Sequence, residues 1–421
     1  MSLVEKEITL NNIERAQHHA EFESRREVEQ KLLPVNPDIF EQLFKPESVR
    51  IEQLYLSTPK DEFSLRLRCT HSPNGAVYKA TQKDRGSINE KALDRIEIDT
   101  TISQEAYEHY RTQELPSIQK RRFEVADGVS VDFYENEQHP VIVEVEHKDP
   151  EVRAALVAMV ETLTGSSLID HSSDPTLTNE AIAHRDTERE VRSPESLDTF
   201  TENVVLEMVA RYVSGSKHVV VGLTGMSGSG KTTVTNGIRS RLVETFGESF
   251  CPIIVSTDDY HFGKTALEQT HGTPYSDWDS PQTYNTAELS HDLELLRKGT
   301  PLIKRHFDFE TEEPSYDELV SPSPFVIIEG LYAGSKDLSG VRDLHFELPT
   351  SIATSIGRDV RRLIIDDRAN RAFPTPESRL RYQIETALPL YLSQERPGRN
   401  TYSASVRSVA ERAFMLVQLT D

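Results

Sequence analysis

The sequence predicts two domains of different fold class: an α+β N-terminal domain built on an antiparallel β-barrel, and an α/β C-terminal domain built on a doubly wound parallel sheet. About eight strand-like segments follow one another at hairpin spacing in the first part of the chain. Later, buried strands alternate with helical stretches, and a glycine-rich turn joins one strand to a helix. The chain of 421 residues is long enough for two hydrophobic cores. The expected boundaries are an N-terminal arm at 1–24, the barrel domain at 25–185, a linker at 186–200 and the C-terminal domain at 201–421.

The composition limits the classes of partner. A formal net charge of −22 argues against nonspecific binding to nucleic acid or to an anionic membrane, while a local basic cavity stays compatible with it. Cys69 and Cys251 lie far apart, which excludes a disulfide framework and a cysteine-based metal motif and fits a reducing compartment. The first residues lack the apolar core of a signal peptide, and no apolar run approaches a membrane span. We therefore expect a cytoplasmic protein that binds small molecules, with no nucleic acid or membrane partner.

The N-terminal strand candidates carry charged side chains in an alternating pattern. They are residues 27–33, 51–57, 64–70, 76–83, 94–102, 117–125, 129–134 and 141–147. Because every second residue of a strand shares a face, Glu27, Glu29 and Lys31 lie together on the first strand, and Glu144 and Glu146 on the last. Basic residues concentrate on the strands between. For any single strand a solvated face is the favoured interpretation. A closed barrel with these residues inside would instead offer a basic wall to polyphosphate and an acidic wall to divalent cations.

The order of these elements resembles the CYTH, or triphosphate tunnel metalloenzyme, family. Its ExExK signature matches Glu27-x-Glu29-x-Lys31, and the later elements arrive in the family's order: Arg66-Leu67-Arg68, Lys83, Arg95-x-Glu97, Lys120-x-Arg122, Asp132 and Glu144-x-Glu146. The resemblance covers roughly residues 22–185. The spacing departs from the family's through a long gap between Ile88 and Arg95 and a longer N-terminal arm.

The resemblance implies a tunnel that binds a triphosphate on its basic side chains. These would be Lys31, Arg66, Arg68, Lys83, Arg95, Lys120 and Arg122. It also implies that Mg²⁺ or Mn²⁺ binds to Glu29, Glu144 and Glu146, with Glu27 nearby. Family activities include triphosphate hydrolysis and adenylate cyclisation. After the last strand, we expect a helix at 151–166 packed on the barrel, a loop at 165–174 and the family's closing turn at 179–184.

The C-terminal part is organised around a phosphate-binding loop. The apolar run His218–Val221 leads into Gly225-x-x-x-x-Gly230-Lys231-Thr232, and a helical sequence follows. Glycines let successive backbone N–H groups point at phosphate oxygens, and the helix adds the positive end of its dipole. Lys231 would reach the β- and γ-phosphates and Thr232 would hold Mg²⁺. The alternative is a glycine-rich turn that binds nothing. The candidate ATP-binding residues are Gly225, Ser227, Gly228, Ser229, Gly230, Lys231, Thr232 and Thr233.

Two acidic residues stand where buried strands end. Asp258 follows the strand at 252–256, and Glu329 follows the strand at 324–328. In parallel sheets ligands bind outside the carboxyl ends of the strands, so both acids should lie beside the phosphate loop. Phosphoryl transfer needs positioned phosphates, Mg²⁺ and a base for the accepting hydroxyl. Each acid has an alternative role, Asp258 as a helix cap or turn residue and Glu329 as a capping or surface carboxylate.

The combined pattern resembles the uridine kinase and phosphoribulokinase branch of P-loop kinases and so implies a P-loop NTPase fold. The matching stretches are 225–233, 256–260, Asp277-Trp278-Asp279-Ser280-Pro281, Phe307-Asp308-Phe309 and 326–332. The resemblance implies that Asp258 is the general base, that Asp279 lies on the ribose or sugar-phosphate side, and that Glu329 holds Mg²⁺ through water. The substrate-binding candidates are Tyr260, Asp279, Phe307 and Asp308.

The family comparison also implies a lid that closes arginines over the transferring phosphates. Candidates are Arg358, Arg361 and Arg362, with Arg368 and Arg371 beyond them; Arg362 is the expected catalytic one. A solvated helix, with Asp359, Asp366 and Asp367 as partners, is equally compatible. Two departures concern the base-reading pocket: Phe307 replaces the usual Tyr, and no His follows until His345.

Three functions follow from these patterns. The first is an ATP- and Mg²⁺-dependent kinase acting on a hydroxyl of a nucleoside or sugar phosphate, with a polyphosphate-binding tunnel. The second is an inorganic triphosphatase or pyrophosphatase in the tunnel, with a regulatory nucleotide-binding domain. The third is a non-catalytic module that senses phosphate compounds.

Overall fold

The structure is a computed structural model of the chain and describes residues 23–89, 92–136, 138–187, 195–273, 275, 277–365 and 373–394. Its contacts divide the chain into two compact units. The N-terminal unit contains residues 1–193 and 351–386, and the C-terminal unit contains 194–350 and 387–421. The predicted arm up to residue 22, the linker positions 188–194, Arg368, Arg371 and the segment from 395 lie outside the described residues.

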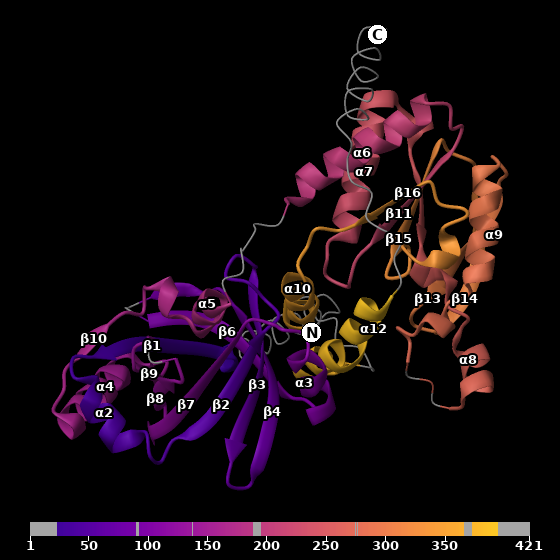
Figure 1. Cartoon of the computed structure of the whole chain (residues 1–421). Helices are drawn as coiled ribbons and strands as arrows, with labels where there is room; N and C mark the ends of the chain where they lie inside the picture. The colour runs from indigo at the N-terminus through magenta and orange to yellow at the C-terminus, as the bar shows by residue number, and fades with distance from the viewer. Residues whose placement is uncertain are drawn as a thin grey trace, which may run out of the picture. The chain divides into compact units, whose positions relative to one another are not determined.

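The N-terminal unit is a closed antiparallel barrel (Figure 1). Its eight strands pair in the order β1, β9, β8, β7, β2, β3, β4, β6, and β6 returns to β1. They are β1 (Arg26–Pro34), β2 (Val49–Tyr55), β3 (Phe63–Ser72), β4 (Gly75–Asp84), β6 (Ala92–Thr101), β7 (Ser117–Ala126), β8 (Val129–Tyr134) and β9 (Ile142–Glu146). Each of the eight predicted strands coincides with one of them, which confirms the predicted barrel. Two short strands, β5 (Ser87–Asn89) and β10 (Leu168–Asp170), extend the sheet.

Strand β1 changes partner along its length. Residues Arg26–Glu29 pair with β6, Glu29–Leu32 with β9 and Leu32–Pro34 with β10. Glu29 therefore has a neighbour on each side, Leu93 and Glu146. This is where the barrel closes.

The barrel has a polar interior and an apolar exterior. On β3, Leu65 and Leu67 are fully buried on one face, while Arg66 and Arg68 line the internal cavity. The apolar exterior of β8 and β9 packs with α2 (Pro37–Phe44) and α4 (Pro150–Thr164) in one core that includes Phe40, Val131 and Val143. The predicted helix at 151–166 is α4, capped by Asp149 and ended by Gly165 at a φ of 65°.

Four further helices belong to this unit. They are α3 (Gln104–Arg111), α5 (Asn179–Asp186), α10 (Ile352–Ile365) and α11 (Pro376–Tyr382). Helix α10 contacts β3 and β4, and α11 contacts β4 and β6. Helices α10 and α11 lie in the part of the sequence that was predicted to form the C-terminal domain, 201–421, but they pack on strands of the barrel. The predicted boundaries of 25–185 and 201–421 do not include this packing.

The C-terminal unit is a parallel sheet in the order β12, β15, β11, β16. The strands are β11 (Val219–Thr224), β12 (Ile253–Ser256), β15 (Phe325–Gly330) and β16 (Leu344–Glu347). Helices α6 (Leu197–Val213) and α7 (Lys231–Phe246) share one hydrophobic core with β11, and α9 (Thr286–Arg297) shares a second core with β11, β12 and β15. Figure 1 shows α9 on the opposite side of this sheet from α6 and α7. The doubly wound parallel sheet is therefore confirmed.

The other elements of this unit are η3 (Thr257–Tyr260), α8 (Lys264–His271), the hairpin β13 (Leu302–Asp308) and β14 (Glu313–Val320), and α12 (Leu388–Ser393). This unit also contains short 3₁₀ turns at 248–250, 281–283 and 336–338, and the N-terminal unit contains one at 175–177. A π-helical turn at 383–387 precedes α12.

Candidate functional site

The barrel encloses a cavity of about 370 Å³, which we call the tunnel. It is lined by nearly all of the charged residues that the sequence singled out. These are Glu27, Glu29, Lys31, Arg66, Arg68, Lys83, Arg95, Arg122, Glu144 and Glu146. Lys120 is the exception: its side chain is fully buried and bonds to Asp132 and Asn179. The alternation along separate strands thus converges on one cavity.

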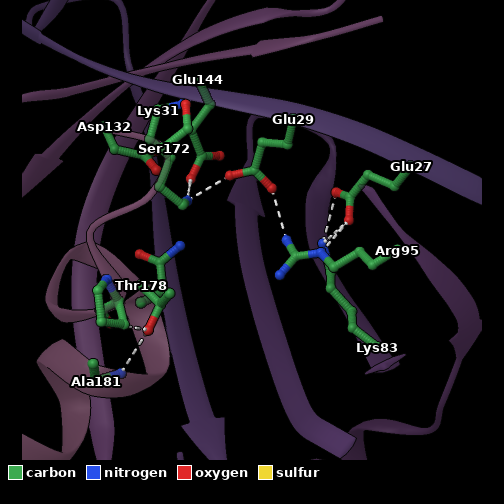
Figure 2. A network of polar contacts seen from close by, with 12 residues as sticks. Glu27, Glu29, Lys31, Lys83, Arg95, Asp132, Glu144, Ser172, Thr178 and Ala181 are labelled. Carbon is green, nitrogen blue, oxygen red and sulfur yellow. Dashed lines mark hydrogen bonds and ion pairs between the residues drawn. The ribbon is translucent and has the colours of Figure 1, made fainter. Parts of the chain in front are cut away.

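The acids and bases of the tunnel alternate in space (Figure 2). Arg95 lies between Glu27 and Glu29, with Nε–Oε2 and Nη2–Oε2 distances of 2.8 and 2.7 Å. Lys31 lies between Glu29 and Glu144, at 2.5 and 2.7 Å from their Oε1 atoms. Lys83 contacts Glu27 at 2.7 Å. The basic wall and the acidic wall therefore neutralise each other.

Asp132 is the most deeply buried acid of this network. Both Asp132 and Lys120 are 0% exposed. Arg122 donates to both Asp132 oxygens, at 2.7 and 2.6 Å, and also to Glu144. Asp132 appeared in the ordered motif set, but no role was assigned to it. The structure shows it orienting Arg122 and Lys120, two predicted phosphate ligands.

The structure adds partners to which the sequence analysis assigned no role. Lys83 also contacts Glu97, at 2.8 Å. Burial acts to raise the pKa of Glu97, but the charges of Lys83 and Arg66 outweigh burial and lower this pKa to about 2. Glu180, on α5, pairs with Arg85 and accepts from Ser57. These partners come from distant segments, so no local pattern reveals them.

Burial and like charges shift the pKa of several tunnel bases. Burial and the neighbouring Arg66 lower the pKa of Arg68 to about 10. Burial and Arg122 lower the pKa of Lys120 to about 7, against the attraction of Asp132. A polyphosphate would oppose both shifts, because negative charge favours the protonated forms.

The carboxylate oxygens of the tunnel are suitable ligands for a divalent cation, but basic side chains separate the carboxylates from one another. Among the described residues no group of three or more His, Cys, Asp or Glu side chains is arranged to hold a metal ion. The cause is visible in Figure 2, since Arg95 and Lys31 stand between the acids. One observation concerns the carboxylate at the edge of this group. Burial and Glu27 raise the pKa of Glu146 to about 7.

In the C-terminal unit, the phosphate loop connects β11 to α7. Gly228 and Gly230 have φ values of 79° and 95°, which residues with a side chain rarely adopt. At Gly225 a Cβ would lie 2.4 Å from Ser229 Oγ. Lys231 begins α7 and donates to the carbonyl oxygens of Gly225 and Met226, at 3.0 and 3.1 Å. The sequence motif therefore folds as the expected cradle; Ser227 lies in its turn, and Thr232 and Thr233 are exposed on the first turn of the helix.

Asp258 and Glu329 lie beside this loop. Glu329 pairs in register with Leu223 of β11 and Ser256 of β12, at the carboxyl ends of these strands. Burial raises the pKa of both carboxyl groups, and the charge of Lys231 acts on both in the opposite direction. One lysine can act on both acids only because all three groups lie close together. The structure thus brings together the base, the metal-side acid and the lysine that the sequence predicted.

The predicted substrate residues separate into two groups. Phe307 is buried against His261 and Trp278, with ring centroids 5.1 and 5.8 Å away. The predicted Asp279 follows Trp278 in the chain. Tyr260, in contrast, is 1% exposed, and its hydroxyl donates to Asp292 of α9. Asp308 is exposed and accepts from the backbone of Glu310 in the β13–β14 turn. Tyr260 and Asp308 thus have structural roles here, as core residue and turn cap.

The predicted lid arginines lie on α10, in the N-terminal unit. Arg358 Nε donates to Glu62 Oε2 at 2.7 Å, and Arg361 lines a surface cavity of about 480 Å³ with barrel residues. Arg362 is exposed. The site prediction for Arg362 stays a prediction.

The C-terminal unit therefore combines a parallel sheet with a phosphate-binding loop between β11 and α7. Residues 220–374 match the model of the family described as Phosphoribulokinase / Uridine kinase. The C-terminal part of the chain therefore contains a uridine kinase/phosphoribulokinase-family domain, and the N-terminal eight-stranded barrel fits a tunnel domain.

Curated relatives include proteins of both kinds. The chain is 28% identical over 179 residues to a uridine kinase of Deinococcus deserti, covering 42% of this chain and 82% of that protein. It is 32% identical over 127 residues to the chloroplastic uridine/cytidine kinase UKL1 of Arabidopsis thaliana, covering 30% and 25%. It is 29% identical over 175 residues to the inorganic pyrophosphatase TTM2 of the same plant, covering 41% and 23%. The chain thus spans about a quarter of the length of each Arabidopsis protein.

No helix within the described part of the chain is both long and apolar enough to span a membrane.

Proposed function

We propose that this chain is an ATP- and Mg²⁺-dependent kinase that phosphorylates a hydroxyl of a nucleoside or sugar phosphate, and that its tunnel binds a polyphosphate. The convergence of Lys231, Asp258 and Glu329 on the phosphate loop carries the kinase proposal. The family match of residues 220–374 supports it.

In the proposed reaction, Asp258 accepts the proton of the substrate hydroxyl as that oxygen attacks the γ-phosphorus of ATP and ADP leaves. Burial raises the pKa of Asp258 and so makes it a stronger base than an exposed carboxylate. The charge of Lys231 acts on this pKa in the opposite direction and favours the ionised form that the reaction needs. Lys231 would also balance charge on the transferring group. The aromatic cluster of His261, Trp278 and Phe307 would pack against the acceptor next to Asp279.

A magnesium ion would neutralise charge on the ATP phosphates. Thr232, on the first turn of α7, and Glu329 are the residues that would hold it. Oxygen donors of this kind are those that Mg²⁺ prefers, and strand pairing places Glu329 at the carboxyl ends of β11 and β12.

The tunnel supports a second activity, hydrolysis of triphosphate or pyrophosphate. Two observations favour it: six of the basic and four of the acidic candidates line the tunnel, and one relative is named an inorganic pyrophosphatase. In this proposal the basic residues bind the phosphates, and Glu29, Glu144 and Glu146 hold Mg²⁺ or Mn²⁺ after the carboxylates exchange Lys31 and Arg95 for the cation. The third candidate is a non-catalytic phosphate sensor, which would bind phosphate compounds with the same residues but would not turn them over.

The experiment is a screen of ATP consumption with uridine, cytidine and pentose phosphates, run beside phosphate release from tripolyphosphate and pyrophosphate. Kinase function predicts that Asp258→Asn lowers acceptor-dependent ATP consumption by about 100-fold or more, while tripolyphosphate hydrolysis persists. If only Glu29→Gln or Glu144→Gln abolishes turnover, the hydrolase is the activity. If the wild-type chain turns over none of these compounds but binds them, the sensor remains.

Both cysteines, Cys69 and Cys251, are free thiols in the structure. This fits the proposed reducing, cytoplasmic setting.

A further inference from the structure

The outer face of strands β3, β4 and β6 is buried. The tunnel-lining residues Arg66 and Lys83 point inward, so their neighbours in sequence lie on the outer face of the barrel. The residues of this outer face are between 0% and 4% exposed: Leu65, Leu67, Ala80, Gln82, Ile98 and Thr100. Helix α10 contacts β3 and β4, and α11 contacts β4 and β6. Both helices come from residues 351–386 of the N-terminal unit, and they cover this wall.

Helix α10 meets the wall at a glycine. A Cβ added to Gly357 would lie 2.3 Å from the ring of Phe63, the first residue of β3. The Gln82 side chain of β4 donates to the Gly357 carbonyl oxygen at 3.2 Å, in a buried setting. One turn away, Arg358 Nε donates to Glu62 Oε2 at 2.7 Å. The absent side chain of Gly357 therefore lets the helix backbone approach both strands closely.

Helix α11 and the turn after it extend this cover to β6 and α3. Arg381 donates to Thr100 Oγ1 at 3.3 Å, and the Tyr110 hydroxyl donates to the Ile384 carbonyl oxygen at 2.8 Å. The apolar residues of α10 that follow helical spacing are all 0% exposed: Ala353, Ile356 and Val360. Separating the helices from the wall would expose apolar surface on both, so we treat them as a permanent part of the barrel unit.

The inner face of the same three strands carries basic side chains of the tunnel. They are Arg66 and Arg68 on β3, Lys83 on β4 and Arg95 on β6. Gln82, which bonds to α10, directly precedes Lys83 in the chain. Lys83 in turn contacts Glu27 and Glu97, at 2.7 and 2.8 Å. Because both faces of a strand share one backbone, a shift of β4 against α10 also moves Lys83 inside the tunnel.

We propose that helices α10 and α11 hold the basic side chains of β3, β4 and β6 in position for polyphosphate, through the docking of Gly357 on Phe63 and Gln82. Phe63 and Gln82 are then positioning residues for a tunnel that they do not line. In this view, a segment inside the family match of 220–374 supports the tunnel. The inference rests on the proposed binding of polyphosphate in the tunnel.

The test measures tripolyphosphate binding by calorimetry, in the full chain with Lys231→Met to weaken binding at the phosphate loop. Gly357→Ala favours the helix but drives a methyl group into the Phe63 ring. We expect it to raise the dissociation constant about tenfold or more at unchanged stoichiometry. Adding Phe63→Ala makes room for the methyl group and should restore most of the affinity. A merely structural defect would instead lower the stoichiometry, because part of the protein would be unfolded.

A second variant, Gln82→Ala, adds no bulk and serves if Gly357→Ala fails to fold. It should raise the dissociation constant about three- to tenfold. Gln119→Ala is its matched control. Gln119 precedes Lys120 on β7 as Gln82 precedes Lys83 on β4, but its side chain accepts from Arg50 of the barrel itself, at 2.7 Å. The control should change the dissociation constant by less than about twofold.

Unchanged or tighter binding in a folded Gly357→Ala chain, or in Gln82→Ala if the former does not fold, would overturn the inference. A loss of affinity that Phe63→Ala does not repair would do the same. Failure of the proposed tunnel function looks different. In that case the Lys231→Met chain binds no tripolyphosphate, or binds it with an affinity that Arg66→Met leaves unchanged, and the inference falls with the function.

Discussion

The tunnel and the phosphate loop differ in the groups that they would offer to an anion. The tunnel would offer side-chain cations, and each of Lys31, Lys83 and Arg95 is paired with carboxylates at 2.5–2.8 Å. The phosphate loop would offer backbone amides, shaped by glycines with positive φ, and its Lys231 is held by carbonyl oxygens instead of carboxylates. A backbone cradle needs no counter-charge, whereas a buried cation does. The tunnel should therefore be more sensitive to loss of one charge, and to pH, than the phosphate loop.

The largest expected effect is on the stability of the tunnel. Asp132→Ala leaves the buried Lys120 and Arg122 without their main partner, so we expect the barrel to lose about 3–5 kcal/mol of unfolding free energy. Urea-induced unfolding followed by far-UV circular dichroism measures it. The exposed pair Lys45–Glu41 is the control, and Glu41→Ala should cost less than about 0.5 kcal/mol. Equal effects of the two changes would contradict the view that the tunnel is a network of obligatory pairs.

A smaller effect on stability, but a large one on activity, is expected at the phosphate loop. Lys231→Met removes a charge that its carbonyl partners do not require, so the unfolding midpoint should hardly move. Acceptor-dependent ATP consumption should fall by about 100- to 1000-fold, because charge on the transferring phosphoryl group loses its partner. Lys298→Met, at an exposed helix position paired with Glu294, is the matched control. A strongly destabilised Lys231→Met protein would remove the contrast between the two sites.

The smallest effect concerns pH. The raised pKa of Glu146, about 7, means that a proton competes with a divalent cation for this carboxylate. Below pH 7 the carboxyl group is mostly protonated, so Mn²⁺ affinity should rise about tenfold from pH 6 to pH 8 and then level off. Titration of the chain with Mn²⁺, monitored by calorimetry, tests this. Glu146→Gln should flatten the profile, and an unchanged slope in that variant would assign the proton to another group.

The strands of the barrel were predictable because each carries its own signal. Charge alternation at Glu27, Glu29 and Lys31 fixes which residues share a face, whatever the strand pairs with. The phosphate loop was predictable for a similar reason, since its glycines and Lys231 act within one short stretch. Asp258 and Glu329 followed from a rule about the ends of parallel strands.

What could not be predicted depends on long-range neighbours or on local side-chain direction. Tyr260 belongs to the stretch 256–260 that resembles the kinase family, and this resemblance made it a substrate-binding candidate. In the structure the turn η3 directs its side chain into the core, where its hydroxyl donates a hydrogen bond to Asp292. Helix α10 shows an apolar stripe at Ala353, Ile356 and Val360, but no local pattern tells which part of the chain covers it. The interruption of the tunnel acids by Lys31 and Arg95 likewise arises only when distant strands meet.

The change of partner along β1 has one more consequence. Glu27 and Glu29 reach the tunnel because β1 alternates in step with β6 and β9 on its two sides. Substitutions in β1 alter one side chain at a time, but inserting or deleting a single residue before Glu27 would turn every following side chain to the opposite face. Both acids and the lysine would then leave the cavity together. Natural variants of this chain should therefore differ in the residue types of β1 far more often than in the length of this strand.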